Sequence, residues 1–255
     1  MLQAHSLLWD YLWVAPNVLL LGLAVVLASR GLSRQFLSFT AFAIVSAIGE
    51  IIVFFADIAP FVSAENFWRI DWANLLITTL LKFVLIGEAF SRVLNPYPSI
   101  SRIGRVLISG VGVVLVFGAS LIAAFSRGDS TRRLISGFHI LEQTAFIIVL
   151  GLIVFLFLFA AYFRLSWDRL SFGVLLGLGI SACVHLSTWA IVANASPSSS
   201  QRIYIDFLNM STYHFCVLIW YYYVLVPGKV TKSAITLPDN NLAVWNRELE
   251  RLLQP

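Results

Sequence analysis

The sequence predicts an all-α membrane protein, a polytopic bundle of seven transmembrane helices. Hydrophobic residues make up 59% of the 255 residues and charged residues only 12%, whereas a soluble domain carries about 25% charged residues. The mean hydropathy is +0.86, and seven apolar stretches each reach the roughly 20 residues that a helix needs to cross a bilayer. So much apolar surface has to be buried in lipid, and the lipid bilayer is therefore the first partner that we expect.

Seven spans are expected, joined by short connections. They are Leu8–Ala28, Phe36–Ala56, Trp68–Ala89, Val106–Phe125, Leu134–Phe163, Ser171–Ala193 and Ile203–Val226. Runs of this length do not form soluble β-strands, and the alternation over about ten residues that marks barrel strands is absent. The chain therefore divides into a transmembrane domain, residues 1–226, and a tail, residues 227–255.

The first four spans differ in how clearly they are marked. The first contains Pro16 and Asn17, which suit a permanent helix better than a cleaved signal. The second and third contain acids, so their assignment depends on length and context, whereas the fourth contains no charge at all. A polar stripe in the third span must face protein or water; it consists of Asp71, Asn74, Thr78 and Lys82.

The last three spans carry signs of close helix packing and of interface anchoring. The fifth is the longest. In the sixth, Gly173 and Gly177 form a motif of small residues four apart, which lets another helix approach closely. The seventh contains Asp206 and ends in the aromatic run Trp220–Tyr223, which is typical of side chains that anchor a helix at the membrane interface.

The distribution of Lys and Arg predicts the orientation. The first, third and fifth connections and the tail are basic, and all four lie on one side if the chain crosses the membrane seven times. Their basic residues are Arg30, Arg34, Arg92, Arg102, Arg105, Arg164, Arg169, Lys229, Lys232, Arg247 and Arg251. The fourth connection, with Arg127, Arg132 and Arg133, is the exception. Because basic connections stay in the cytoplasm, we expect the N-terminus outside and the C-terminus in the cytoplasm.

The tail is expected to end in an amphipathic cytoplasmic helix within residues 239–255. Leu242, Trp245 and Leu249 recur there at helical spacing, and charged residues fill the opposite face. Such a helix lies on the membrane surface or docks a cytoplasmic or membrane protein partner. Both interpretations stay open.

Ionisable residues in the spans form the candidate ligand-binding site, because such side chains are costly in a membrane and mark functional sites by default. Counting about 1.5 Å per residue along each helix places most of them in the outer half of the bundle or near its centre, and Asp71 and Asp206 at its outer edge. The candidates are Glu50, Asp71, His139, Glu142, His185, Asp206 and His214. Their convergence predicts a polar cavity that is open toward the outside.

The histidines raise the question of a metal or haem cofactor. His139, His185 and His214 with nearby carboxylates could ligate zinc or another divalent metal, but no two of them share a close helical spacing. Hydrogen bonds between helices are the simpler explanation of each histidine, and no motif selects haem ligation. The cofactor therefore stays unknown.

Several classes of protein are disfavoured by missing motifs. The rhodopsins carry their retinal lysine in the seventh helix, whereas Lys82 lies in the third span, where snorkelling or an ion pair accounts for it. The last span holds His214 alone, not the paired histidines of the hydrolases related to adiponectin receptors and alkaline ceramidases. There is also no P-loop, G-x-S-x-G or H-E-x-x-H motif.

Three short segments carry a resemblance over the whole chain. They are Asn95-Pro-Tyr-Pro98, Leu165-Ser-Trp-Asp168 and the segment from Trp245 to Leu253. In these the chain resembles a group of uncharacterised bacterial seven-helix membrane proteins of about this size. The resemblance implies a bacterial inner membrane and carries no activity or functional residues.

The function that the sequence favours is that of a non-enzymatic sensor that binds a small molecule from the outer side. Binding would shift helix packing and be transmitted to the cytoplasmic loops and the tail helix. One alternative is an intramembrane metal-dependent enzyme; its residues would be His139, Glu142, His185 and His214. A transporter or a scaffold subunit that binds its partner through residues 239–255 is a further alternative. No nucleic-acid partner is expected.

Overall fold

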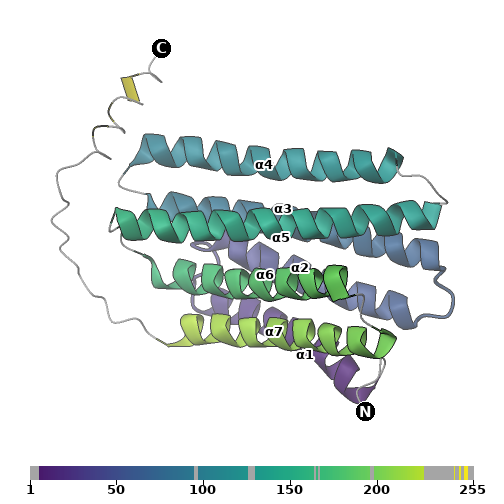
Figure 1. Cartoon of the computed structure of the whole chain (residues 1–255). Coiled ribbons are helices and arrows are strands. Elements are labelled where there is room, and N and C mark those ends of the chain that lie inside the picture. Colours follow the sequence, from purple (N-terminus) through teal and green to yellow (C-terminus); the bar gives the residue numbers. More distant parts are fainter. Residues whose placement is uncertain are drawn as a thin grey trace.

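The described part of the chain is entirely helical (Figure 1). The computed structural model describes residues 6–94, 97–125, 130–163, 165, 167–195, 198–226, 244, 247, 250 and 251. The helices are α1 Leu7–Ser29, α2 Leu37–Ile58, α3 Ala64–Val93, α4 Pro98–Phe125, α5 Ser130–Tyr162, α6 Arg169–Ala195 and α7 Ser199–Leu225. The predicted tail helix falls mostly outside the described residues, and the four tail residues that are described are helical.

Five of these helices are long and apolar enough to cross a membrane. Within the described residues they are α1, α2, α3, α6 and the part of α5 from Glu142 to Tyr162. Their apolar windows are only partly buried inside the bundle, so the remaining apolar surface has to be covered by lipid. The chain is therefore a multi-pass membrane protein.

Six helices form a closed ring and α4 lies at its periphery. Each helix from α1 to α7 packs against its neighbour in the chain, and α7 packs against α1 to close the ring. Because α3 also packs directly against α5, α4 covers the outside of this pair and takes no place in the ring. Successive helices run in opposite directions, and the described part of the bundle has its N-terminus at one end (Figure 1). We call this end the N-terminal end and the other the C-terminal end.

Side chains satisfy the free backbone groups at several helix ends. Ser6 caps α1, Ser63 caps α3, and Ser198 forms a capping box with Gln201 at the start of α7. At the C-terminal end of the bundle, Arg30 donates to the carbonyl oxygen of Val224 at 2.8 Å, which satisfies an acceptor in the last turn of α7.

The start of α2 is capped from a different helix. Glu88 on α3 accepts a hydrogen bond from the backbone N–H of Ser38 at 3.2 Å. Arg92 donates to the same carboxylate at 2.6 Å, and its guanidinium lies over the ring of Phe36 at 4.1 Å. The i,i+4 spacing of Glu88 and Arg92 is the spacing of an ion pair on a helix surface. Here the pair also fixes α2 to α3.

The packing of α6 on α7 depends on two glycines. A Cβ on Gly177 would overlap the indole of Trp220, and a Cβ on Gly173 would overlap Tyr223. Trp220 is 1% exposed and donates its indole N–H to the carbonyl oxygen of Val174 at 3.2 Å. The expectation that Trp220 anchors the helix at the membrane interface is therefore wrong; the residue is an interhelical core contact.

The hydrophobic core fills the C-terminal half of the ring. Its fully buried members include Leu23 and Leu27 of α1, Phe39 of α2 and Leu156 of α5. The indole of Trp220 meets the ring of Phe39 edge to face, with centroids 5.6 Å apart. This apolar layer separates the C-terminal end from the polar interior toward the N-terminal end.

Candidate functional site

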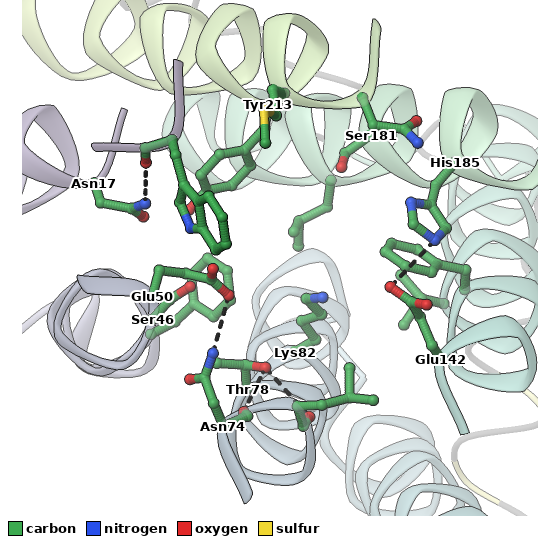
Figure 2. A pocket seen from close by; sticks show the side chains of 18 of the residues that line it. Asn17, Ser46, Glu50, Asn74, Thr78, Lys82, Glu142, Ser181, His185 and Tyr213 are labelled. Carbon is green, nitrogen blue, oxygen red and sulfur yellow. Dashed lines mark hydrogen bonds and ion pairs between the residues drawn. The ribbon is translucent and has the colours of Figure 1, made fainter. Parts of the chain in front are cut away.

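A cavity of about 340 Å³ lies inside the ring, with side chains from α1, α2, α3, α5, α6 and α7 on its walls (Figure 2). The four candidates Glu50, Asp71, Glu142 and His185 are among its lining residues. The polar stripe of α3 lines it too, as the helical spacing from Asp71 to Lys82 predicts. Phe42 and Trp220 also line it, on the side of the apolar core.

Glu50 is held in place by Asn74 of the neighbouring helix. The Asn74 side-chain N–H donates to Glu50 Oε1 at 2.9 Å (Figure 2). This approach requires Gly49, because a Cβ at that position would overlap the Asn74 amide. Thr78 donates its hydroxyl to the backbone oxygen of Asn74 at 2.8 Å, so the cavity face of α3 is linked by hydrogen bonds for more than one turn.

Glu142 and His185 face each other across the cavity wall between α5 and α6. His185 Nε2 lies 3.3 Å from Glu142 Oε1, and its ring is stacked on Phe146, with centroids 4.1 Å apart. Glu142 and Phe146 are four residues apart on α5 and therefore share one face of that helix. Glu142 and Phe146 therefore position the imidazole of His185 together, one at its Nε2 atom and the other at its ring face.

A short hydrogen-bonded chain extends from His185 to α7. Thr188 donates its hydroxyl to the backbone oxygen of His185 at 2.8 Å. The same hydroxyl lies 3.1 Å from Asn209 Oδ1, and Asn209 lines the cavity. Thr188 therefore links the backbone of His185 to Asn209 across the seam between α6 and α7.

Lys82 lines the cavity, although it is not among the seven predicted ligand-binding residues. Its side chain points into the cavity between Glu50 and Glu142 (Figure 2), and its Nζ lies 4.9 Å from the centre of the Phe146 ring. It is close enough to interact electrostatically with both carboxylates, but it forms no direct ion pair with a described acid. Helical side chains lean toward the N-terminus of their helix, and this direction carries the ammonium toward the cavity and away from the C-terminal end.

Asn17 is a second residue that the sequence argument did not include. It is 2% exposed, lines the cavity and donates its side-chain N–H to the backbone oxygen of Trp13 at 2.7 Å. Its Oδ1 is buried and has no hydrogen-bond partner among the described residues. The sequence does mark Asn17, because it is a polar amide residue in the middle of an apolar helix, directly after Pro16.

Two of the seven candidates lie away from the cavity, and a third has a side chain that the structure does not describe. Asp206 is exposed on α7, and His214 points toward α1, with its ring centroid 5.8 Å from that of Tyr11. Neither lines the cavity. His139 lies in α5, but its side chain is outside the described residues. Of the six candidates whose side chains are described, four line the cavity, and the placement of His139 stays a prediction.

No metal centre is assembled from the side chains that the structure describes. Within those residues no three His, Cys, Asp or Glu side chains are placed to hold one ion. Of the four residues that the metal-enzyme hypothesis uses, Glu142 and His185 line the cavity and His214 does not. What the described site offers is carboxylate, ammonium, imidazole and amide groups for binding a polar molecule.

The fold and site together define a multi-pass membrane protein with a polar cavity enclosed by its helices. Comparison with protein families, with curated proteins and with solved structures finds no match. The resemblance to bacterial seven-helix membrane proteins therefore stays a prediction, and the cavity is the feature of the molecule that bears on its function.

Proposed function

We propose that this chain is a non-enzymatic sensor with seven transmembrane helices, which binds a small molecule in the cavity of its ring. The observation that carries the proposal is one cavity lined by Glu50, Asp71, Lys82, Glu142 and His185. Ionisable groups at membrane depth are rare, and they mark ligand and ion sites by default.

The volume of the cavity supports binding over a purely structural role. Protein interiors are close-packed, and a void large enough for several atoms destabilises the fold. About 340 Å³ is instead within the range of small-molecule pockets, roughly 300–1000 Å³. The mixture of apolar walls and a few polar groups is also the composition of such pockets.

The orientation follows from charge. Arg30, Arg92 and Arg169 all belong to the C-terminal end of the bundle, and basic residues favour the cytoplasmic side. The acidic part of the cavity, at Glu50 and Asp71, belongs to the opposite half, and we therefore propose that the ligand enters from outside. In a bacterial inner membrane, which the sequence resemblance favours, this is the periplasmic side.

The route of the signal runs along α7. The cavity meets α7 at Asn209 and Tyr213, and the far end of the helix is held by Arg30. Between them Tyr221 donates its hydroxyl to the backbone oxygen of Leu19 on α1 at 2.8 Å. A small rotation of α7 on ligand binding therefore reaches the cytoplasmic end, where residues 239–255 would pass it to a protein partner.

A ligand screen with the purified protein tests this function. Glu142→Gln removes the carboxylate that lies against His185, and His185→Ala removes the imidazole. We expect compounds that raise the melting temperature of the wild type to raise that of both variants less, while membrane insertion is unchanged. A broad screen in which no compound shifts the wild-type protein would contradict the proposal.

A further inference from the structure

One wall of the cavity is rich in hydrogen-bond acceptors. Asn17 Oδ1 on α1 is buried without a donor among the described residues. Glu50 on α2 adds a carboxylate, and Asp71 on α3 adds another, which forms no hydrogen bond or ion pair with a described residue. A buried acceptor without a donor costs about 1–3 kcal/mol. Asn17 Oδ1 and the Asp71 carboxyl group therefore lack donors among the described residues, and Glu50, which already accepts from Asn74, can accept a further hydrogen bond from a bound molecule.

The charges of the cavity also favour a ligand that carries hydrogen-bond donors and a positive charge. Three carboxyl groups face it, and Asp71 is close enough to interact electrostatically with both Glu50 and Glu142. Against them stands Lys82, which interacts with both Glu50 and Glu142, while the imidazole of His185 lies 3.3 Å from Glu142. Uncompensated charge at membrane depth is costly. A cation bound near Asp71 would compensate the remaining negative charge.

The walls around this acceptor-rich region are aromatic. Trp13, Phe42, Tyr213 and Trp220 line the same cavity, and Trp13 interacts with the carboxylate of Glu50. Aromatic faces attract organic cations and also bury apolar groups. A bare metal ion would use neither property, whereas an amine attached to an apolar body would use both.

We propose that the ligand is a small organic amine, whose ammonium group lies among Asn17, Glu50 and Asp71 and whose apolar body lies against Trp13, Tyr213 and Trp220. This inference rests on the proposed function, since it names the ligand class of that same cavity. The ammonium donates three hydrogen bonds, one to each of the three acceptor groups. No bond is made or broken.

Four compounds with one shared ring test the charge of the ligand. Phenethylamine is the cation, 2-phenylethanol its neutral analogue, phenylacetate the anion and phenylalanine the zwitterion. Each is titrated into the purified full-length protein while the melting temperature and the binding heat are recorded. We expect phenethylamine to bind at least tenfold more tightly than the other three. Tighter binding of the anion or zwitterion, or equal binding of the neutral analogue, overturns the inference.

A matched pair of variants on α3 tests the position of the ammonium. Asp71→Asn removes a carboxylate of the cavity, and Glu65→Gln removes one at the surface of the same helix, where it pairs with Arg69. Asp71→Asn should weaken phenethylamine binding at least tenfold, and Glu65→Gln should leave it unchanged. Equal affinity in both variants overturns the inference, provided that both fold with wild-type melting temperatures; if Asp71→Asn does not fold, Asn17→Leu serves instead.

The two proposals fail separately. If none of the four compounds binds but a broad screen finds a neutral or anionic ligand that Glu142→Gln weakens, the amine inference is wrong and the sensor function stands. If no compound of the broad screen binds, both are wrong.

Discussion

Gly49 and Asn74 illustrate how a single missing side chain shapes the site. The absence of a Cβ on Gly49 allows the Asn74 amide to lie against α2 and to donate to Glu50. A hydrogen bond to a charged group contributes about 1.5–3 kcal/mol. The orientation of the Glu50 carboxylate therefore depends on a glycine that has no polar group of its own.

Gly49→Ala should lower the free energy of unfolding by about 1.5–3 kcal/mol, because the new Cβ displaces Asn74 from Glu50. Thermal unfolding of the purified protein measures the loss. Gly151→Ala is the control, since a Cβ there meets nothing within 4 Å, and it should leave stability unchanged or raise it by up to about 1 kcal/mol.

A double-mutant cycle identifies the cause. In an Asn74→Ala background the amide is absent, so Gly49→Ala should cost much less than in the wild type. The same cost in both backgrounds would mean that the alanine acts by another route.

At the scale of residues, the sequence identifies the ionisable side chains within the spans, but it does not predict which of them face the cavity. Glu50, Asp71, Glu142 and His185 line the cavity, whereas His214 does not. The depth of a residue follows from counting along its helix, but its direction depends on how that helix is rotated in the bundle. Tyr213 and His214 are successive residues about 100° apart on α7, and only Tyr213 faces the cavity.

At the scale of elements, the seam between α6 and α7 is the contact that most constrains the ring. The sixth span was expected to offer a small-residue face, and Gly173 and Gly177 do so. What the pattern of one helix does not specify is the partner that fills this face. Trp220 fills it, and its hydrogen bond to Val174 fixes the register of the two helices.

Gly177→Ala should destabilise the protein by about 1–3 kcal/mol, because the indole of Trp220 is rigidly packed and cannot move aside. Gly179→Ala is the matched control on the same helix, since its Cβ would make an ordinary contact with Ile153 at 3.5 Å. The melting temperatures of the two variants measure the difference. A Gly177→Ala protein as stable as the Gly179→Ala protein would contradict the conclusion that α6 packs on α7 through the contact of Gly177 with Trp220.

At the scale of the whole molecule, the sequence predicts the helices well and their arrangement poorly. The first expected span, Leu8–Ala28, differs from α1 by one residue at each end. The expected fourth span begins at Val106, whereas α4 begins at Pro98, because a helix continues through polar turns that an apolar window leaves out. Apolar runs do not tell which helices are neighbours, so the peripheral place of α4 could not be predicted.

The proposed orientation predicts opposite labelling of the two ends of the bundle. Phe61, 88% exposed, lies between α2 and α3 at the N-terminal end, and Arg34 is exposed between α1 and α2 at the C-terminal end. In a protein with Cys183 and Cys216 replaced by serine, a membrane-impermeant maleimide should label Phe61→Cys in intact spheroplasts. It should label Arg34→Cys only after lysis. The reverse pattern would place the cavity toward the cytoplasm.

The central claim is that a small molecule occupies the cavity of the ring, and a pair of serine variants on α6 tests it most directly. Ser181 lines the cavity, whereas Ser187 is exposed on the same helix. Ser181→Phe fills the cavity and Ser187→Phe does not. The measurement is the shift in melting temperature caused by a ligand from the screen at one hundred times its Kd, at which binding stabilises the folded protein by about 2.7 kcal/mol. We predict that the wild type and Ser187→Phe keep the shift and that Ser181→Phe loses it. A full shift in Ser181→Phe would show that the ligand binds elsewhere.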